Sequence, residues 1–131
     1  MARFEVENLT NAGKIGTATT RPGYSGRSYV TGWKRADGAL TANILAFFPV
    51  AYRMRVRVIS TSGATLTVRI DGEVEHVIAV PASNPSSWSA ANDYEFQIQL
   101  SGGFHSLAFE PGEVGEIDVD HIDLLSTDTT T

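Results

Sequence analysis

Hydrophobic and polar residues alternate with a period of two along much of the chain. In residues 51–59 an apolar set faces one side and three arginines face the other: Tyr52, Met54, Val56 and Val58 against Arg53, Arg55 and Arg57. Successive side chains of a β-strand point to opposite faces of the sheet. The pattern therefore predicts a strand with one face in the core and one face in water.

Similar segments recur between turns rich in Gly, Pro, Asn and Ser, and none has the 3.6-residue period of an amphipathic helix. They cover residues 3–9, 29–32, 40–47, 66–70, 74–80, 96–100, 106–109 and 117–125. The Asp71-Gly72 pair marks a hairpin turn between two of them. About nine short strands spaced in this way predict an all-β fold, a β-sandwich (jelly roll) of two antiparallel sheets.

Length and composition fit one folded domain. The chain has 131 residues, close to the commonest domain size. Hydrophobic residues make up 42% and charged residues 19%, which are ordinary values for a globular protein. We expect residues 1–125 to form the sandwich, and the polar, patternless residues 126–131 to be a tail or the start of a linker.

Charge and cysteine content exclude several kinds of site. The formal net charge of −5 disfavours nucleic-acid binding, because phosphate backbones select basic surfaces. There are no cysteines, so the chain offers neither disulfides nor thiolate metal ligands. The start lacks the apolar core of a signal peptide, and no stretch approaches the roughly 18 apolar residues of a membrane span. We expect neither a nucleic-acid nor a membrane partner.

Acidic residues gather near both ends of the chain. Glu5 and Glu7 share a face of the presumed first strand, and Asp118 and Asp120 share a face of the last. If these strands meet, the carboxylates converge, and like charges then need a cation or a shared proton. Ca²⁺, which takes about 6–8 oxygen ligands, suits such a cluster. An exposed acidic edge without a metal explains the same spacing.

Four aromatic residues stand in segments rich in Gly and Ser: Tyr24, Tyr29, Trp33 and Trp88. Sugar rings stack their apolar C–H faces on flat aromatic rings, so rings exposed in loops are candidate sugar platforms. The alternative is that each ring caps the core, which is the more frequent role of a single Trp.

The arginine stripe of residues 53–57 fits an anionic ligand such as a uronate, or a solvated sheet face. In the second case Glu73, Glu75 and Glu95 would offset its charge. The histidines have neither zinc-site spacing nor a nucleophile beside them, and we expect structural roles for all three: His76, His105 and His121.

Three segments, in this order and at this spacing, resemble carbohydrate-binding module families 6 and 35. They are residues 4–8 (Phe-Glu-Val-Glu-Asn), residues 23–33 (Gly-Tyr-Ser-Gly, then Tyr-Val-Thr-Gly-Trp) and residues 119–124 (Val-Asp-His-Ile-Asp-Leu). The resemblance implies a β-jelly roll with a structural calcium ion between the terminal strands. Carried over to this sequence, the metal ligands would be Glu5, Glu7, Asp120 and the carbonyl of Arg27.

The resemblance also implies a sugar site in the loops at one end of the sandwich. Trp33 and Trp88 match the aromatic positions of that site, with Tyr24 and Tyr29 nearby in sequence. Asp118 stands where the family has an Asn, and His121 stands where it has a Tyr. A carboxylate at position 118 is able to accept hydrogen bonds from sugar hydroxyls or to help bind a second calcium ion.

These features predict a non-catalytic domain that binds an oligo- or polysaccharide. It would direct a partner enzyme or assembly to glycan, outside the cell or at its surface, as part of a larger protein. The alternative is a structural or protein-interaction jelly roll of a virion or surface assembly, since a fold does not determine a function. A glycosidase would need two carboxylates about 5–10 Å apart across a cleft. Apart from its carboxylates, nothing in the sequence indicates an activated nucleophile. We therefore expect that the chain is not an enzyme.

Overall fold

The structure is a computed structural model that describes residues 2–5, 9, 15–46, 50–91 and 93–126 of the chain. Side chains are described for residue 9 and for residues 15–46, 51–91 and 93–125. Of the helices in these ranges, none has the length and apolar character needed to span a bilayer.

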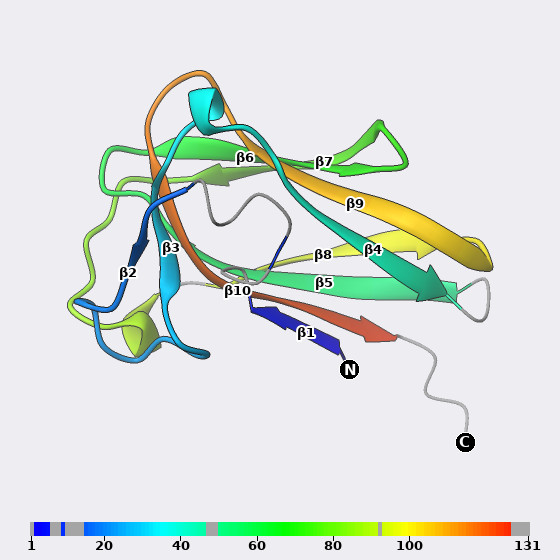
Figure 1. Ribbon diagram of the computed structural model, residues 1–131, viewed down its shortest axis with the longest axis horizontal. Helices are drawn as coiled ribbons and strands as arrows, with labels where there is room; N and C mark the ends of the chain where they lie inside the picture. Colours follow the sequence, from blue (N-terminus) through cyan, green and yellow to red (C-terminus); the bar gives the residue numbers. More distant parts are fainter. Residues whose placement is uncertain (1, 6–8, 10–14, 47–49, 92, 127–131) are drawn as a thin grey trace.

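The strands form two antiparallel sheets that pack face to face (Figure 1). The six-stranded sheet consists of β1 (Ala2–Glu5), β2 (Thr17–Ala18), β3 (Tyr29–Trp33), β5 (Val50–Ile59), β8 (Asp93–Leu100) and β10 (Ile117–Ser126). The four-stranded sheet has the order β4 (Leu40–Ala46), β9 (Gly103–Pro111), β6 (Ala64–Ile70), β7 (Glu73–Val80). The predicted all-β jelly-roll sandwich is confirmed.

The predicted strands recur with shifted bounds. β9 is longer than the predicted segment 106–109, and the two-residue β2 was not predicted, because it is too short to alternate. For the predicted strand 3–9, residues 6–8 lie outside the described residues and Leu9 is in a bend. Ser126 belongs to β10 rather than to a tail, and residues 127–131 lie outside the described part of the chain.

The apolar faces of the two sheets meet in the main core. β5 contributes Met54, Val56 and Val58, as its alternation predicts. Trp33 is also part of this core, and its indole Nε1 donates a hydrogen bond to the carbonyl oxygen of Gly38 at 2.8 Å. The bond satisfies a donor that burial would otherwise leave without water.

β10 organises the six-stranded sheet because it pairs along both edges. β5 pairs with one edge, while β3 and β1 share the other. β1 runs antiparallel to β10, with Glu5 opposite His121 and Ala2 opposite Leu124. The register along β10 shifts between Val119 and His121, which marks a β-bulge at Asp120. The first and last strands therefore meet, as the calcium hypothesis requires.

Candidate functional site

Two loops, residues 19–28 and 81–91, contact each other beside β3, on the side of the molecule where β2 lies (Figure 1). The backbone N–H of Trp88 donates to the carbonyl oxygen of Pro22 at 2.8 Å, and the hydroxyl of Ser87 donates to the same oxygen at 3.1 Å. Gly23 has φ of 88°, and a Cβ atom there would lie 2.7 Å from Ser87 Oγ. Only glycine permits this conformation and this close approach.

A shallow polar cavity of about 270 Å³, wide open to solvent, lies between these loops. It is lined by Thr20, Arg21, Tyr29, Asn84, Pro85 and Ser86. The guanidinium of Arg21 donates to the Pro85 carbonyl oxygen at 2.8 Å and to the Asn84 side-chain oxygen at 3.1 Å. The Tyr29 hydroxyl accepts a bond from the Arg21 backbone N–H at 3.0 Å.

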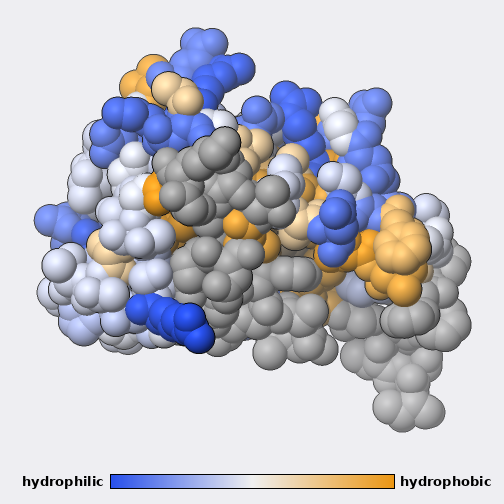
Figure 2. Space-filling model, in the orientation of Figure 1, coloured by the Kyte–Doolittle hydropathy of each residue, from blue (hydrophilic) through white to orange (hydrophobic). Residues whose placement is uncertain are grey.

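The cavity offers both donors and acceptors to a ligand. The acceptors that hold the Arg21 guanidinium are neutral, and among the described residues no carboxylate contacts it. Its remaining N–H groups are donors, while the hydroxyls of Thr20 and Ser86 donate and accept. Figure 2 shows that the surface over β2 and the neighbouring loops is mostly pale, with a few strongly hydrophilic residues among the pale ones. This chemistry suits a ligand rich in hydroxyl groups.

The predicted aromatic platforms are mostly buried. Trp33 and Trp88 are each 0% exposed, and Tyr29 is 3% exposed. The expectation that both tryptophans present a ring face to a sugar is therefore wrong, because burying a large apolar ring is more favourable than leaving it in water. Tyr29 is nonetheless one of the residues that line the cavity, whereas Tyr24 is half-buried.

Trp88 belongs to a second, smaller core on the outer face of the six-stranded sheet, with Tyr29 and Ile59. It lies in the short 3-10 helix η4 (Trp88–Ala90), and the Tyr29 and Trp88 rings meet edge to face with centroids 5.2 Å apart. Its indole Nε1 is buried without a hydrogen-bond partner among the described residues. The ring thus anchors the loop 81–91 to the sheet.

Asp118 is used within the protein. Its Oδ1 accepts hydrogen bonds from the Thr31 hydroxyl and from the Gly32 backbone N–H, both at 2.9 Å. Gly32 has φ of 61°, a left-handed conformation that glycine adopts without strain. The carboxylate holds this irregular point of β3 against β10. Its contact with a sugar stays a prediction.

Of the predicted calcium ligands, Asp120 is the one whose carboxylate the structure describes. It is 0% exposed, and its two oxygens accept bonds from the Ser25 backbone N–H at 2.9 and 3.0 Å. Glu7 and the side chain of Glu5 lie outside the described residues, and Arg27 is exposed. Within the described ranges, no three His, Asp or Glu side chains are grouped to hold a metal ion. The calcium ion stays a prediction.

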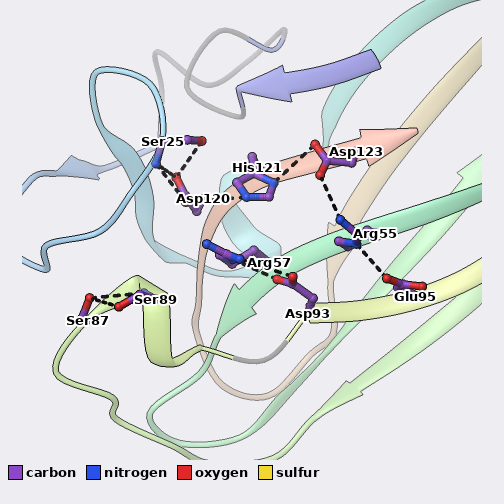
Figure 3. Close-up of polar contacts among 10 residues, drawn as sticks. All are labelled: Ser25, Arg55, Arg57, Ser87, Ser89, Asp93, Glu95, Asp120, His121 and Asp123. Carbon is purple, nitrogen blue, oxygen red and sulfur yellow. Dashed lines mark hydrogen bonds and ion pairs between the residues drawn. The ribbon is translucent and has the colours of Figure 1, made fainter. Parts of the chain in front are cut away.

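A network of charged side chains covers the outer face of β10, β5 and β8 (Figure 3). His121 is 2% exposed and lies between two carboxylates, with Nε2 4.0 Å from Asp120 Oδ2 and Nδ1 3.6 Å from Asp123 Oδ1. Arg55 connects Asp123, at 3.8 Å, to Glu95, at 2.7 Å.

The charge partners of the arginine stripe were only partly predicted. Glu95 is confirmed as one of them, whereas Asp93 and Asp123 were missed. Glu73 and Glu75 lie on β7 in the other sheet. The alternation of Asp93, Glu95 and Gln97 indicated that one face of this strand is polar. The sequence pattern did not indicate that this strand lies beside the arginine stripe.

No family model matches the sequence. The cycloisomaltooligosaccharide glucanotransferase of Niallia circulans is 27% identical over 127 residues, which make up 95% of this chain and 13% of that protein. The cycloalternan-forming enzyme from Listeria monocytogenes, solved with a pentasaccharide substrate, superposes with a TM-score of 0.76 at 29% identity. That match covers 95% of this chain and 12% of the enzyme.

A family 35 carbohydrate-binding module from Clostridium thermocellum superposes with a TM-score of 0.73 at 17% identity. The match covers 96% of this chain and 98% of that module. This chain has the fold of a family 35 carbohydrate-binding module. The resemblance predicted from three short segments is confirmed at the level of the fold. The chain spans only 13% of the length of the curated relative that it matches.

The residues that line the loop cavity were mostly missed at the level of sequence. Arg21, Asn84 and Ser86 stand in turn-rich segments with no distinctive motif. The useful signal was the composition of the loop around Trp88, which is rich in Ser, Asn and Pro. That composition marks a surface loop, but only the contact with loop 19–28 makes it one wall of a cavity.

Proposed function

We propose that this domain binds carbohydrate without catalysing a reaction on it, and that it holds a larger glycan-active protein on its substrate outside the cell. Two comparisons support the proposal. A free-standing carbohydrate-binding module shares the fold over nearly its whole length. Two glycan-active enzymes include a segment of similar sequence that makes up 12–13% of their chains.

The observation that carries the proposal is the cavity at which Arg21, Asn84 and the Tyr29 hydroxyl converge. Carbohydrate sites combine a few well-placed polar groups with a flat apolar surface. Tyr24 supplies a candidate surface, since its half-buried ring lies against Tyr29 with centroids 5.6 Å apart. A small open site of this kind buries little ligand surface, so we expect weak binding.

Isothermal titration of the whole chain with isomalto-, manno- and xylo-oligosaccharides tests the proposal. Arg21→Ala should weaken binding about tenfold or more, because charge-assisted hydrogen bonds are each worth about 1.5–3 kcal/mol. Tyr24→Ala should also weaken it. Arg35→Ala is the matched control, since that exposed arginine pairs with Glu113 away from the cavity. Heat from none of the sugars, or binding unchanged in both loop variants, would contradict the site.

A structural calcium ion is the second part of the proposal. Its support is the pairing of β1 with β10, which brings the backbone of Glu5 opposite His121 and so beside the buried Asp120. Calcium would bind carboxylate and carbonyl oxygens there and connect the two ends of the chain. It would stabilise the fold and take no direct part in binding the sugar.

One observation favours the alternative of an interaction domain. Leu45 and Phe104 are opposite each other on β4 and β9, and they are 44% and 80% exposed. Figure 2 shows apolar surface where β4 ends and β9 begins. Exposed apolar residues of this kind often contact another protein surface. Failure of every sugar to bind, together with self-association in light scattering, would favour this function over carbohydrate binding.

A further inference from the structure

The outer face of β5 and β8 presents polar side chains in register, away from the loop cavity. The two strands are antiparallel, and three pairs stand opposite each other on this face: Arg57 and Asp93, Arg55 and Glu95, Arg53 and Gln97. Side chains opposite each other on one face of a sheet lie close enough to interact. Two of these pairs join opposite charges, and the third joins an arginine to a neutral amide.

Of these three arginines, Arg53 makes the weakest ion pair. The Arg57 guanidinium donates to both carboxylate oxygens of Asp93, at 2.9 and 3.3 Å. Arg55 donates to Glu95 at 2.7 Å. Arg53 approaches Glu95 only to 3.8 Å, and its side chain is 56% exposed. The guanidinium of Arg53 is therefore largely accessible to solvent, and the carboxylate beside it is already bound to Arg55.

An open cleft of about 540 Å³ lies at this end of the stripe. It is lined by Arg53, Glu95, Phe96 and Gln97. The Gln97 side chain is exposed, and its amide makes no hydrogen bond to the described residues. Arg53 supplies donors, Glu95 supplies acceptors and Gln97 supplies both. Neighbouring hydroxyls of a sugar ring need the same mixture, because each hydroxyl donates one bond and accepts others.

We propose that this cleft is a second saccharide site, which takes a neutral oligosaccharide through Arg53, Glu95 and Gln97. The inference rests on the proposed function, since it adds a site to a carbohydrate-binding domain. The charge of Arg53 is offset by the adjacent Glu95, and the whole chain carries −5, so an acidic sugar gains little there. With two sites on one domain, a polysaccharide that reaches both is held more tightly than by either alone.

Nitrogen-15 NMR of the whole chain, titrated with isomaltohexaose and with mannohexaose, tests the site. We expect the side-chain N–H signals of Arg53 and Gln97 to shift, with a concentration dependence separate from that of the loop signals. Arg53→Ala and Gln97→Ala should each weaken binding at this cleft about fivefold, the effect of losing an ordinary hydrogen bond. Arg21→Ala should leave the cleft titration unchanged.

Gln99→Ala is the matched control, because Gln99 is exposed on the same face of β8 and does not line the cleft. Shifts confined to the loop residues would overturn the second site and leave the proposed function intact. The absence of shifts anywhere would overturn both. Tighter binding of trigalacturonate than of the neutral sugars at Arg53 would overturn the neutral ligand class.

Discussion

At the scale of single residues, His105 and Asp71 connect the turn between β6 and β7 to β9. His105 Nδ1 is 2.7 Å from Asp71 Oδ2, and Nε2 is 2.7 Å from the carbonyl oxygen of Ser101. Both ring nitrogens face acceptors, and only the protonated ring donates from both. The bond to Asp71, then that to Ser101, raises the pKa of His105. The Ser106 N–H, then His105, lowers the pKa of Asp71.

This pair predicts a pH window of stability. The raised pKa of His105 stabilises the fold below its ordinary value of 6.5, and the effect is lost as pH rises through the folded pKa. The lowered pKa of Asp71 stabilises the fold above 3.8, and the effect is lost as pH falls through the folded pKa. Between these values, His105→Gln and Asp71→Asn should lower the free energy of unfolding relative to the unsubstituted chain.

Urea unfolding measured from pH 3 to pH 9 checks this window. Asp71 has φ of 52°, and Asn tolerates this left-handed conformation, so Asp71→Asn removes the charge without straining the turn. The deficit of both variants should shrink as pH rises through the raised pKa of His105, because the histidine of the unsubstituted chain then loses its proton. A deficit that stays the same at every pH would show that the pair has no electrostatic role.

At the scale of elements, the loop 81–91 depends on one ring. Trp88 packs with Tyr29 and Ile59 on the outer face of the six-stranded sheet, and its backbone N–H is bonded to Pro22. The loop therefore has its own small core, separate from the main core between the sheets. Because this loop forms one wall of the polar cavity, the packing of Trp88 also determines the shape of the candidate sugar site.

Trp88→Ala should lower the free energy of unfolding by about 3–5 kcal/mol, since it deletes a fully buried aromatic side chain. It should also abolish binding at the loop cavity. Trp88→Phe is the control, because it keeps a ring and removes an N–H that has no partner among the described residues. Chemical denaturation measures the free energy of unfolding of both variants. If Trp88→Ala lowered the free energy of unfolding by less than about 1 kcal/mol, the ring would not be part of a core.

At the scale of the whole molecule, the pairing of β1 with β10 brings the ends of the described chain together (Figure 1). A metal ion at this junction would bind the folded state alone, because the unfolded chain separates its ligands. Such an ion raises the free energy of unfolding, and the increase grows with the logarithm of the ratio of the ion concentration to Kd. The effect is about 2.7 kcal/mol at 100 times Kd.

Calcium should therefore raise the melting temperature above that of the protein in EDTA, while magnesium at the same concentration should have a smaller effect. Glu7→Gln should reduce the calcium-dependent increase. Asp118→Asn should preserve it, since Asp118 bonds to β3 instead. Scanning calorimetry with and without calcium measures both. Superimposable melting curves in calcium and EDTA would refute the structural ion.

The period-two alternation by itself determined the class of fold and the inward face of β5. These follow from the sequence because a strand exposes alternate residues to opposite faces wherever it lies. The order of three short segments was also sufficient for the resemblance to a carbohydrate-binding module. The hairpin at Asp71-Gly72 was likewise local, because a two-residue turn needs no distant partner.

Tertiary structure alone decided which candidate residues face a ligand. An aromatic residue in a loop has the same local pattern whether it binds a sugar or anchors the loop. What distinguishes Trp88 is the approach of residues 19–28, some sixty positions earlier in the chain. In the same way, Arg53 differs from Arg55 and Arg57 through its neighbours on β8 and β10. Burial and charge compensation arise from contacts between distant segments, which alternation along one strand does not encode.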